Sequence, residues 1–298
     1  MNLSISALVT NYNTWELTTK SIEKLQQYGK KYLRQVLVMD DASVQRPAKA
    51  FPPQVKVIYN QENQGLIVTV NRGFSHLRED IILLFDSDAY PLNDYTEIVI
   101  KKFTENPRLA ALGFQTFDEQ GNTTASWQRA PDAIGLLLGQ KLEAIYQHRF
   151  KSNQTQPILL YQCAVAIRRQ AFEDVGGFDE NFDWLDADLD FSLKLHSKGW
   201  DVEVEPDLRA FHQGGGTFQA TSARVLRHHQ NRWRLLRKHS LISHPRLLKL
   251  GLAIRHWLEY ATLKVAGKLV FPDEKIREDK VRSRQKLIST VWQDYSSC

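Results

Sequence analysis

The sequence has little of what membrane-spanning, secreted or disulfide-stabilised proteins require. No segment approaches the roughly 18 uninterrupted apolar residues of a membrane-spanning helix. Residues 1–10 lack the basic segment and long apolar core of a secretion signal. Cys163 and Cys298 are the only cysteines, too few for a disulfide framework or a four-cysteine zinc site. We therefore expect a cytoplasmic protein in a reducing compartment.

The composition is that of a folded globular protein with an uneven charge distribution. The 298 residues are 42% hydrophobic and 24% charged, enough for one large core or two modest ones. Residues 220–298 contain 17 Lys/Arg against 6 Asp/Glu, whereas residues 1–219 contain 22 against 28. The chain is thus expected to combine an acidic domain, 1–219, with a basic helical region, 220–298.

The most informative segment is an apolar run followed by two acids. Residues 81–85 are all apolar, as in a strand buried on both faces, and Asp86 and Asp88 follow directly. Carboxylates at this spacing suit a hard divalent cation, which usually completes its coordination with water and substrate phosphates. An ordinary turn is the alternative interpretation. A calcium loop of the EF-hand type is excluded, because Pro91 stands where that loop needs Gly.

Strands and helices are predicted to alternate along the first half of the chain. Such alternation indicates a parallel sheet that binds ligands at the C-terminal ends of its strands, where Thr10, Tyr12, Asp40 and Asp88 fall. The predicted strands are 3–10, 35–39, 55–59, 81–85 and 109–114, and the predicted helices are 13–29, 66–77 and 93–104. Later in the chain we expect helices at 134–146 and 184–197 and strands at 162–167 and 202–204.

Asp188 is the candidate general base. On a helix from 184 to 197 it lies in line with Trp184, Phe191 and Leu195. A carboxylate within an apolar stripe is costly unless it is used, and burial raises its pKa toward the range of a base. Alternatively, the helix begins later and Asp188 only caps it. Asp190, four residues before Lys194, is expected to form a solvated ion pair.

His212 follows the last predicted strand and precedes three glycines, 214–216. An imidazole at this place is either a metal ligand or a structural histidine. The glycines allow the backbone to approach a bound phosphate or a loop to close over it, which favours the ligand role.

Taken together, the ordered motifs closely resemble family 2 glycosyltransferases of the GT-A fold, in particular the rhamnosyltransferase-like branch. The resemblance covers roughly residues 3–217 and implies a Rossmann-like, mostly parallel central sheet flanked by helices, with a C-terminal helical extension. The motifs are 9–13 (VTNYN), 38–43 (VMDDAS), 60–65 (NQENQG) with 71–73 (NRG), 84–88 (LFDSD), 176–180 (GGFDE), 188–190 (DLD), 199–200 (GW) and His212.

This resemblance implies an inverting transfer of a sugar from a nucleoside diphosphate to a hydroxyl of a glycan or lipid-linked acceptor, assisted by Mn²⁺ or Mg²⁺. The implied roles are the nucleobase and ribose for Thr10, Tyr12 and Asp40, the donor for Asn71 and Asp86, the cation for Asp88 and His212, and the general base for Asp188. Trp184 and Trp127 either stack on a sugar of the acceptor or pack within the protein. The 127–131 loop and the branch resemblance favour dTDP-rhamnose as the donor.

One departure from the family pattern is Ala187, which stands where the family usually has Glu before the base. This departure is the best hint of an alternative function, a nucleotide-sugar-binding module that has lost turnover. A nucleotidyltransferase is disfavoured, because no Gly-rich triphosphate loop follows the first strand.

Arg and Lys in residues 220–298 are interleaved with Trp and Leu. Such helices either lie on an anionic membrane surface, as a lipid-linked acceptor would favour, or pack on the catalytic domain with solvated basic faces. No nucleic-acid-binding module is recognised, and we expect no nucleic-acid partner. The sequence does not indicate an oligomeric state.

Overall fold

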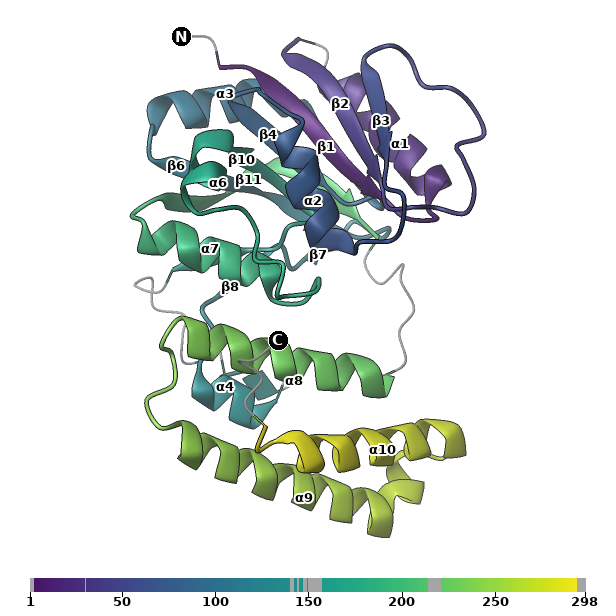
Figure 1. Ribbon diagram of the computed structural model, residues 1–298, viewed down its shortest axis with the longest axis vertical. Helices are drawn as coiled ribbons and strands as arrows, with labels where there is room; N and C mark the ends of the chain where they lie inside the picture. Colours follow the sequence, from purple (N-terminus) through teal and green to yellow (C-terminus); the bar gives the residue numbers. More distant parts are fainter. Residues whose placement is uncertain are drawn as a thin grey trace. The chain divides into compact units, whose positions relative to one another are not determined.

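The structure is a computed structural model that describes residues 3–29, 31–139, 142–143, 145–146, 149, 157–213 and 221–293 (Figure 1). The chain divides into two compact units. We call residues 1–130 with 157–216 the α/β unit, and residues 131–156 with 217–298 the helical unit. The sequence analysis placed 131–156 with the first domain, whereas here these residues belong to the helical unit.

Half of the main sheet is parallel, as the alternation of strands and helices predicts. Its order is β3–β2–β1–β4, and each neighbouring pair is parallel. All residues of β1 and β4 are buried, which explains the unbroken apolar sequence of β4. The elements are β1 (Ile5–Asn11), α1 (Trp15–Gly29), β2 (Leu33–Asp40), β3 (Val55–Tyr59), α2 (Leu66–Ser75) and β4 (Ile81–Phe85).

The other half of the sheet is mixed, which the sequence alone did not predict. β10 lies antiparallel between β4 and β6, β11 is parallel to β6, and β5 closes the edge antiparallel to β11. β7 pairs with β6, and β8 and β9 form a separate ribbon. The elements are β5 (Ala89–Pro91), α3 (Thr96–Glu105), β6 (Leu109–Phe117), β7 (Thr123–Thr124), β8 (Trp127–Arg129), β9 (Ile158–Leu160), β10 (Ala164–Arg168), α6 (Arg169–Asp174), α7 (Ala187–Ser197) and β11 (Asp201–His212).

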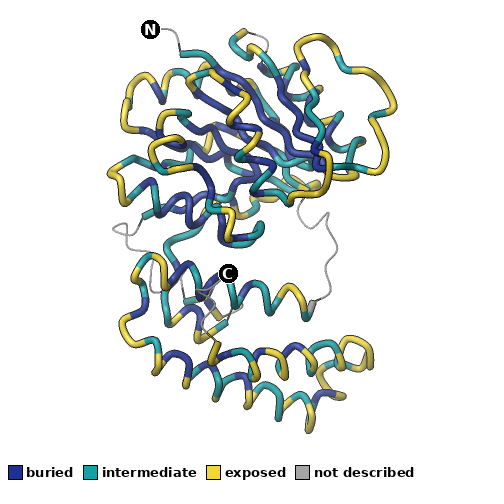
Figure 2. Tube along the Cα trace, in the orientation of Figure 1, coloured by how far each residue is buried: buried dark blue, intermediate teal, exposed yellow. Residues whose placement is uncertain are grey.

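The core of the α/β unit forms around the central strands (Figure 2). Phe85 at the end of β4 packs edge-on against Phe114 of β6, with ring centroids 5.3 Å apart. Tyr95 is fully buried, and its hydroxyl donates to the carbonyl oxygen of Leu25 in α1. The strand end that precedes the two acids is therefore fixed from several sides.

Two predicted elements differ from the structure near their ends. α7 begins at Ala187 and not at 184, because Asp186 adopts a left-handed conformation (φ 63°) and Asp183 accepts from the backbone N–H of Leu185 in a local turn. β11 continues to His212, well past the predicted 202–204.

The helical unit consists, among its described residues, mainly of α4 (Ala133–Leu138), α8 (Thr221–Lys238), α9 (Pro245–Val270) and α10 (Glu274–Thr290). Trp233, Leu236, Leu248 and Leu252 belong to its core. The predicted 134–146 helix is interrupted at Gly139, whose φ of 81° ends α4. Among the described residues, no helix is both long and apolar enough to traverse a bilayer.

Candidate active site

Asp86 and Asp88 lie in a tight turn directly after β4. The backbone N–H of Asp86 donates to the carbonyl oxygen of Cys163 (3.1 Å), and the N–H of Ala89 donates back to the carbonyl oxygen of Asp86 (3.1 Å). These bonds connect the turn to the residue that precedes β10. The strand therefore delivers both carboxylates to one edge of the sheet, as the sequence predicts.

His212 reaches the same turn through the pairing of β5 with β11. In this antiparallel pair, His212 stands opposite Ala89, the residue after Asp88. Its Nε2 lies 3.7 Å from Oδ1 of Asp88. One ligand atom from each of Asp86, Asp88 and His212 lies within 4.8 Å of the other two. The structure thus brings His212, which is distant in the sequence, to the turn that carries Asp86 and Asp88.

This group carries concentrated negative charge. Burial, followed by the charge of Asp88, raises the pKa of Asp86 to about 6, while His212 opposes the shift. Carboxylate oxygens are hard ligands and an imidazole nitrogen is a borderline one, and this combination suits Mn²⁺ or Mg²⁺. A bound divalent cation would offset the repulsion between the carboxylates, so the donor set fits such an ion.

Asp188 lies in the first turn of α7, one residue after the helix begins. The later start removes Trp184 from the helix, yet Asp188, Phe191 and Leu195 still follow one another at helical spacing. Burial, followed by the charge of Asp186, raises the pKa of Asp188 to about 7, although the backbone N–H of Leu189 donates a hydrogen bond to it (2.8 Å). Asp186, and not Asp188, stands at the N-cap of α7, so Asp188 lies within the helix with the raised pKa expected of a base.

Asp190 differs from its prediction. It is fully buried rather than solvated. Lys194, its expected partner, donates through Nζ to the carbonyl oxygens of Val175 and Gly177. The favourable spacing of the two residues did not reveal that the 175–178 turn covers this face of the helix.

Two residues that the sequence analysis did not identify join the two groups of acids. The backbone of Gln162 lowers the pKa of Asp188 against the effect of burial, while the carbonyl oxygen of the next residue, Cys163, accepts a hydrogen bond from the backbone N–H of Asp86. Burial and the charges of Asp86, Asp188 and Asp88 all raise the pKa of the Cys163 thiol. Asp188 and the acidic turn are therefore neighbours of one short segment.

Gln162 also has an unsatisfied side chain. It is 7% exposed, and its Oε1 has no hydrogen-bond partner among the described residues. Buried polar atoms are usually paired, so this oxygen is available to accept a hydrogen bond. No sequence pattern marked Gln162, because a single glutamine before a strand carries no spacing signal.

Residues at the ends of β1 and β2 form a polar network. The amide of Asn11 donates from Nδ2 to Asp40 Oδ1 (2.5 Å), and Ser43 donates to Asp40 through both its hydroxyl (2.5 Å) and its backbone N–H (3.0 Å). Asp40 is fully buried and Thr10 is buried, whereas Tyr12 is 50% exposed. Asp40 has no exposed surface and accepts three hydrogen bonds within this network, whereas Tyr12 is accessible.

Asn71 holds the turn of the Gly-Gly-Phe-Asp-Glu motif. Its Nδ2 donates to the Phe178 carbonyl oxygen and to Glu180 Oε1 (2.9 Å each), and its Oδ1 accepts from the Phe178 N–H (3.0 Å). Gly177 has φ 67°, and a Cβ there would lie 2.9 Å from Asn71 Oδ1. Asn71 thus holds this turn through its side chain, and the donor contact that the resemblance implies stays a prediction.

The two tryptophans expected near the acceptor lie outside regular helices. Trp127 is in β8, is 37% exposed, and has the guanidinium carbon of Arg129 5.3 Å from its ring centroid. Trp184 is half-buried in the turn before α7. Trp127 pairs in register with Leu160, two residues before Gln162.

A surface hollow of about 680 Å³ lies elsewhere in the α/β unit. Lys198, Gly199 and Trp200 line it, together with residues of α6. These residues follow the C-terminal end of α7, whereas Asp188 lies in the first turn. None of the candidate site residues lines this hollow.

Sequence comparisons identify the family. A model described as glycosyl transferase family 2 matches residues 6–176. The inactive polypeptide N-acetylgalactosaminyltransferase-like protein 5 of Macaca fascicularis is 23% identical over 209 residues, covering 64% of this chain and 47% of that protein. The N-acetylglucosaminyl-diphospho-decaprenol L-rhamnosyltransferase of Mycobacterium tuberculosis is 24% identical over 221 residues, covering 66% and 72%. The chain thus spans about half the length of the first relative.

The structural comparison identifies the fold. GalNAc-T7, solved with UDP, GalNAc and Mn²⁺, superposes with a TM-score of 0.60 at 16% sequence identity, covering 95% of this chain and 55% of that one. The α/β unit accordingly has the GT-A glycosyltransferase fold. Because the family model matches more than half of the sequence, the chain belongs to glycosyl transferase family 2.

Proposed function

We propose that this protein is an inverting glycosyltransferase that moves a sugar from a nucleoside diphosphate sugar to a hydroxyl of a glycan or lipid-linked acceptor. One observation carries the proposal. Cys163 accepts a hydrogen bond from the backbone N–H of Asp86, and its thiol lies close enough to Asp86, Asp88 and Asp188 for all three charges to raise its pKa. A candidate base and a candidate cation site are thereby held close to each other, as transfer within one cleft requires.

Asp86, Asp88 and His212 would hold the divalent cation. When bound, the cation supplies positive charge that stabilises the leaving diphosphate. The donor set itself supports this assignment, since three ligand atoms lie within 4.8 Å of one another. A solved neighbour of the same fold contains Mn²⁺ and UDP, which makes Mn²⁺ the first ion to test.

Asp188 would act as the general base. Its raised pKa of about 7 allows it to be deprotonated near neutral pH and to accept a proton from an acceptor hydroxyl. As the proton moves to Oδ of Asp188, the hydroxyl oxygen attacks the anomeric carbon from the side opposite the leaving group. A single displacement of this kind inverts the configuration at that carbon.

The remaining candidate residues would bind the two substrates. Tyr12, exposed at the end of β1, would contact the nucleobase. The buried residues Thr10 and Asp40 would support the surface on which the nucleobase binds. Trp127 and Trp184 would contact the acceptor. Gln162 is added here, because its unpaired Oε1 could accept a hydrogen bond from a sugar hydroxyl.

The first donor and acceptor to test follow from the relatives. The Mycobacterium tuberculosis relative is named as a rhamnosyltransferase acting on N-acetylglucosaminyl-diphospho-decaprenol. We therefore propose dTDP-rhamnose as the donor and a lipid-linked or glycan hydroxyl as the acceptor. An envelope polysaccharide or glycolipid would be the product.

Transfer and binding should be measured on the same preparations. The assay follows release of nucleoside diphosphate from dTDP-, UDP- and GDP-sugars with Mn²⁺ and an acceptor panel. Asp188→Asn should bind the active donor with wild-type affinity but lose transfer. Glu105→Gln, an exposed carboxylate on α3, is the matched control and should keep full activity.

The competing function is a nucleotide-sugar-binding module without turnover. Two observations favour it: Ala187 precedes Asp188, and the first relative is named as inactive. The family model also ends at residue 176, before both Asp188 and His212. Donor binding by the wild type, with neither transfer nor donor hydrolysis across the panel, would overturn our proposal in favour of this module.

A further inference from the structure

Helix α9 of the helical unit carries a continuous exposed apolar face. Each of seven large apolar side chains lies three, four or seven residues from another of the set, which places them within about one third of the helix circumference. They are between 48% and 89% exposed. We call them the α9 stripe: Leu247, Leu250, Ile254, Trp257, Leu258, Val265 and Leu269.

A different face of the same helix builds the core of the unit. Leu248, Leu252 and His256 are buried there. Buried and exposed positions therefore alternate along α9, as Figure 2 shows. The α9 stripe is thus additional to the face that folding uses, and an apolar surface of this length usually marks an interaction site.

Positive charge flanks the α9 stripe. On a helical projection, Arg246, Lys264 and Lys268 fall along one border of the stripe, close to Trp257. α9 contains five Lys/Arg and a single acid, Glu259. Apolar side chains bordered by cations and an aromatic ring are typical of helices that lie in a membrane interface.

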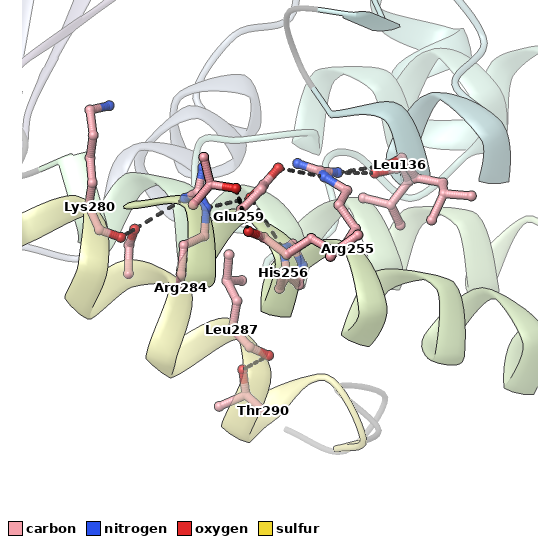
Figure 3. Close-up of polar contacts among 12 residues, drawn as sticks. Leu136, Arg255, His256, Glu259, Lys280, Arg284, Leu287 and Thr290 are labelled. Atoms are coloured by element: carbon pink, nitrogen blue, oxygen red, sulfur yellow. Dashed lines mark hydrogen bonds and ion pairs between the residues drawn. The ribbon is translucent and has the colours of Figure 1, made fainter. Parts of the chain in front are cut away.

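An open groove of about 670 Å³ adjoins the stripe between α9, α10 and the end of α4. Ile254 and Leu258 of the stripe line it, together with Arg255, Lys280 and Arg284. Glu259 is its sole acid among the described lining residues and pairs with Arg255 (2.8 Å) and with Arg284 (2.5 Å), as Figure 3 shows. The groove therefore carries excess positive charge beside an apolar surface.

We propose that the α9 stripe and this groove form a docking surface for an anionic lipid bilayer, with α9 lying in the membrane interface. Apolar contact and attraction to lipid phosphates would act together on this face. A second copy of the chain fits less well, because pairing the same basic faces would bring like charges together. The proposal does not depend on the proposed activity.

Vesicle sedimentation of the full-length protein tests this surface. We expect binding to vesicles of phosphatidylcholine with phosphatidylglycerol, and at least about tenfold weaker binding to phosphatidylcholine alone, since each nearby cation contributes about 1 kcal/mol with anionic lipid. The double variant Ile254→Ser, Leu258→Ser should lose about tenfold in binding. Ile276→Ser, similarly exposed on α10 but outside the stripe, is its matched control and should bind as the wild type does.

A charge-reversal pair separates specific attraction from the effect of net charge. Lys264→Glu with Lys268→Glu should reduce binding to anionic vesicles by about tenfold or more. Lys49→Glu with Lys101→Glu makes the same charge change in the α/β unit and should have little effect. Circular dichroism should show that all variants remain folded, because every substituted side chain is exposed.

Three results would overturn the proposal. The first is a wild-type protein that does not bind anionic vesicles. The second is a stripe variant that binds them as well as the wild type does. The third is a wild-type protein that is a dimer in light scattering and does not bind vesicles, together with a stripe variant that is a monomer. That result would assign the α9 stripe to self-association.

Discussion

Replacing Asp188 with Asn should stabilise the protein at neutral and alkaline pH while abolishing transfer. The ionised carboxylate is disfavoured in the folded state, first by burial and then by the charge of Asp186. A pKa raised from 3.8 to about 7 means that the folded protein disfavours ionisation of Asp188 by about 4 kcal/mol relative to the unfolded chain. Asparagine has a similar shape and can still accept a hydrogen bond from the Leu189 N–H, but it carries no charge.

The sign of the pH dependence follows from the direction of this shift. Well below pH 4, Asp188 is protonated in both the folded and unfolded states and contributes no pH dependence. As the pH rises from about 4 to about 7, the unfolded chain ionises first, so wild-type stability falls. The stability advantage of Asp188→Asn should therefore grow by about 2 to 3 kcal/mol between about pH 5 and about pH 8.

Urea unfolding of both proteins across this pH range measures the effect. Subtracting the unfolding free energy of the wild type from that of the variant removes the contribution of all other titrating groups. For the control Glu105→Gln, this difference should not change with pH. In the same range, wild-type kcat/KM should rise with pH up to about 7, as Asp188 loses its proton. A stability difference that does not change with pH would refute a raised pKa at Asp188 and, with it, the physical argument for its role.

Substitutions at Gly177, Asn71, Asp88 and His212 test the supporting geometry. Gly177→Ala should destabilise the protein by about 1 to 3 kcal/mol more than Gly176→Ala in urea unfolding. Both glycines have positive φ, but a Cβ at 177 would lie 2.9 Å from Asn71 Oδ1, whereas a Cβ at 176 meets nothing within 4 Å. Equal effects of the two substitutions would exclude crowding against Asn71. Asn71→Ala should lower the unfolding free energy by about 1 to 3 kcal/mol through its lost hydrogen bonds; an unchanged stability would contradict its positioning role. Asp88→Asn should weaken Mn²⁺ binding in calorimetry by about tenfold or more, as should His212→Gln; wild-type affinity in either would remove that residue from the site.

Local patterns sufficed to predict the parallel half of the sheet and the acidic turn. The run of residues 81–85 is apolar because β4 is buried on both faces, and the position of Asp86 and Asp88 after it follows from chain order alone. Helical spacing likewise placed Asp188 in line with Phe191 and Leu195. These features depend on short segments, so the sequence contains the information directly.

Features that depend on long-range pairing could not be predicted in this way. The antiparallel insertion of β10 between β4 and β6 brings Cys163 to Asp86, and no periodicity in residues 162–167 distinguishes the two strand directions. The buried state of Asp190 depends on the 175–178 turn that covers it. The start of α7 was misplaced because Asp183 and Asp186 form a local turn that competes with the helix.

The central claim is that a cation held at Asp88 and a base at Asp188 act on one donor sugar. A crystal structure of Asp188→Asn with Mn²⁺ and the nucleoside diphosphate sugar that binds most tightly tests it directly. We predict Mn²⁺ coordinated by Asp88 and the diphosphate, with the anomeric carbon facing residue 188 across a space that admits one hydroxyl. A donor whose sugar points away from residue 188, or Mn²⁺ bound without contact to Asp88, would contradict the claim.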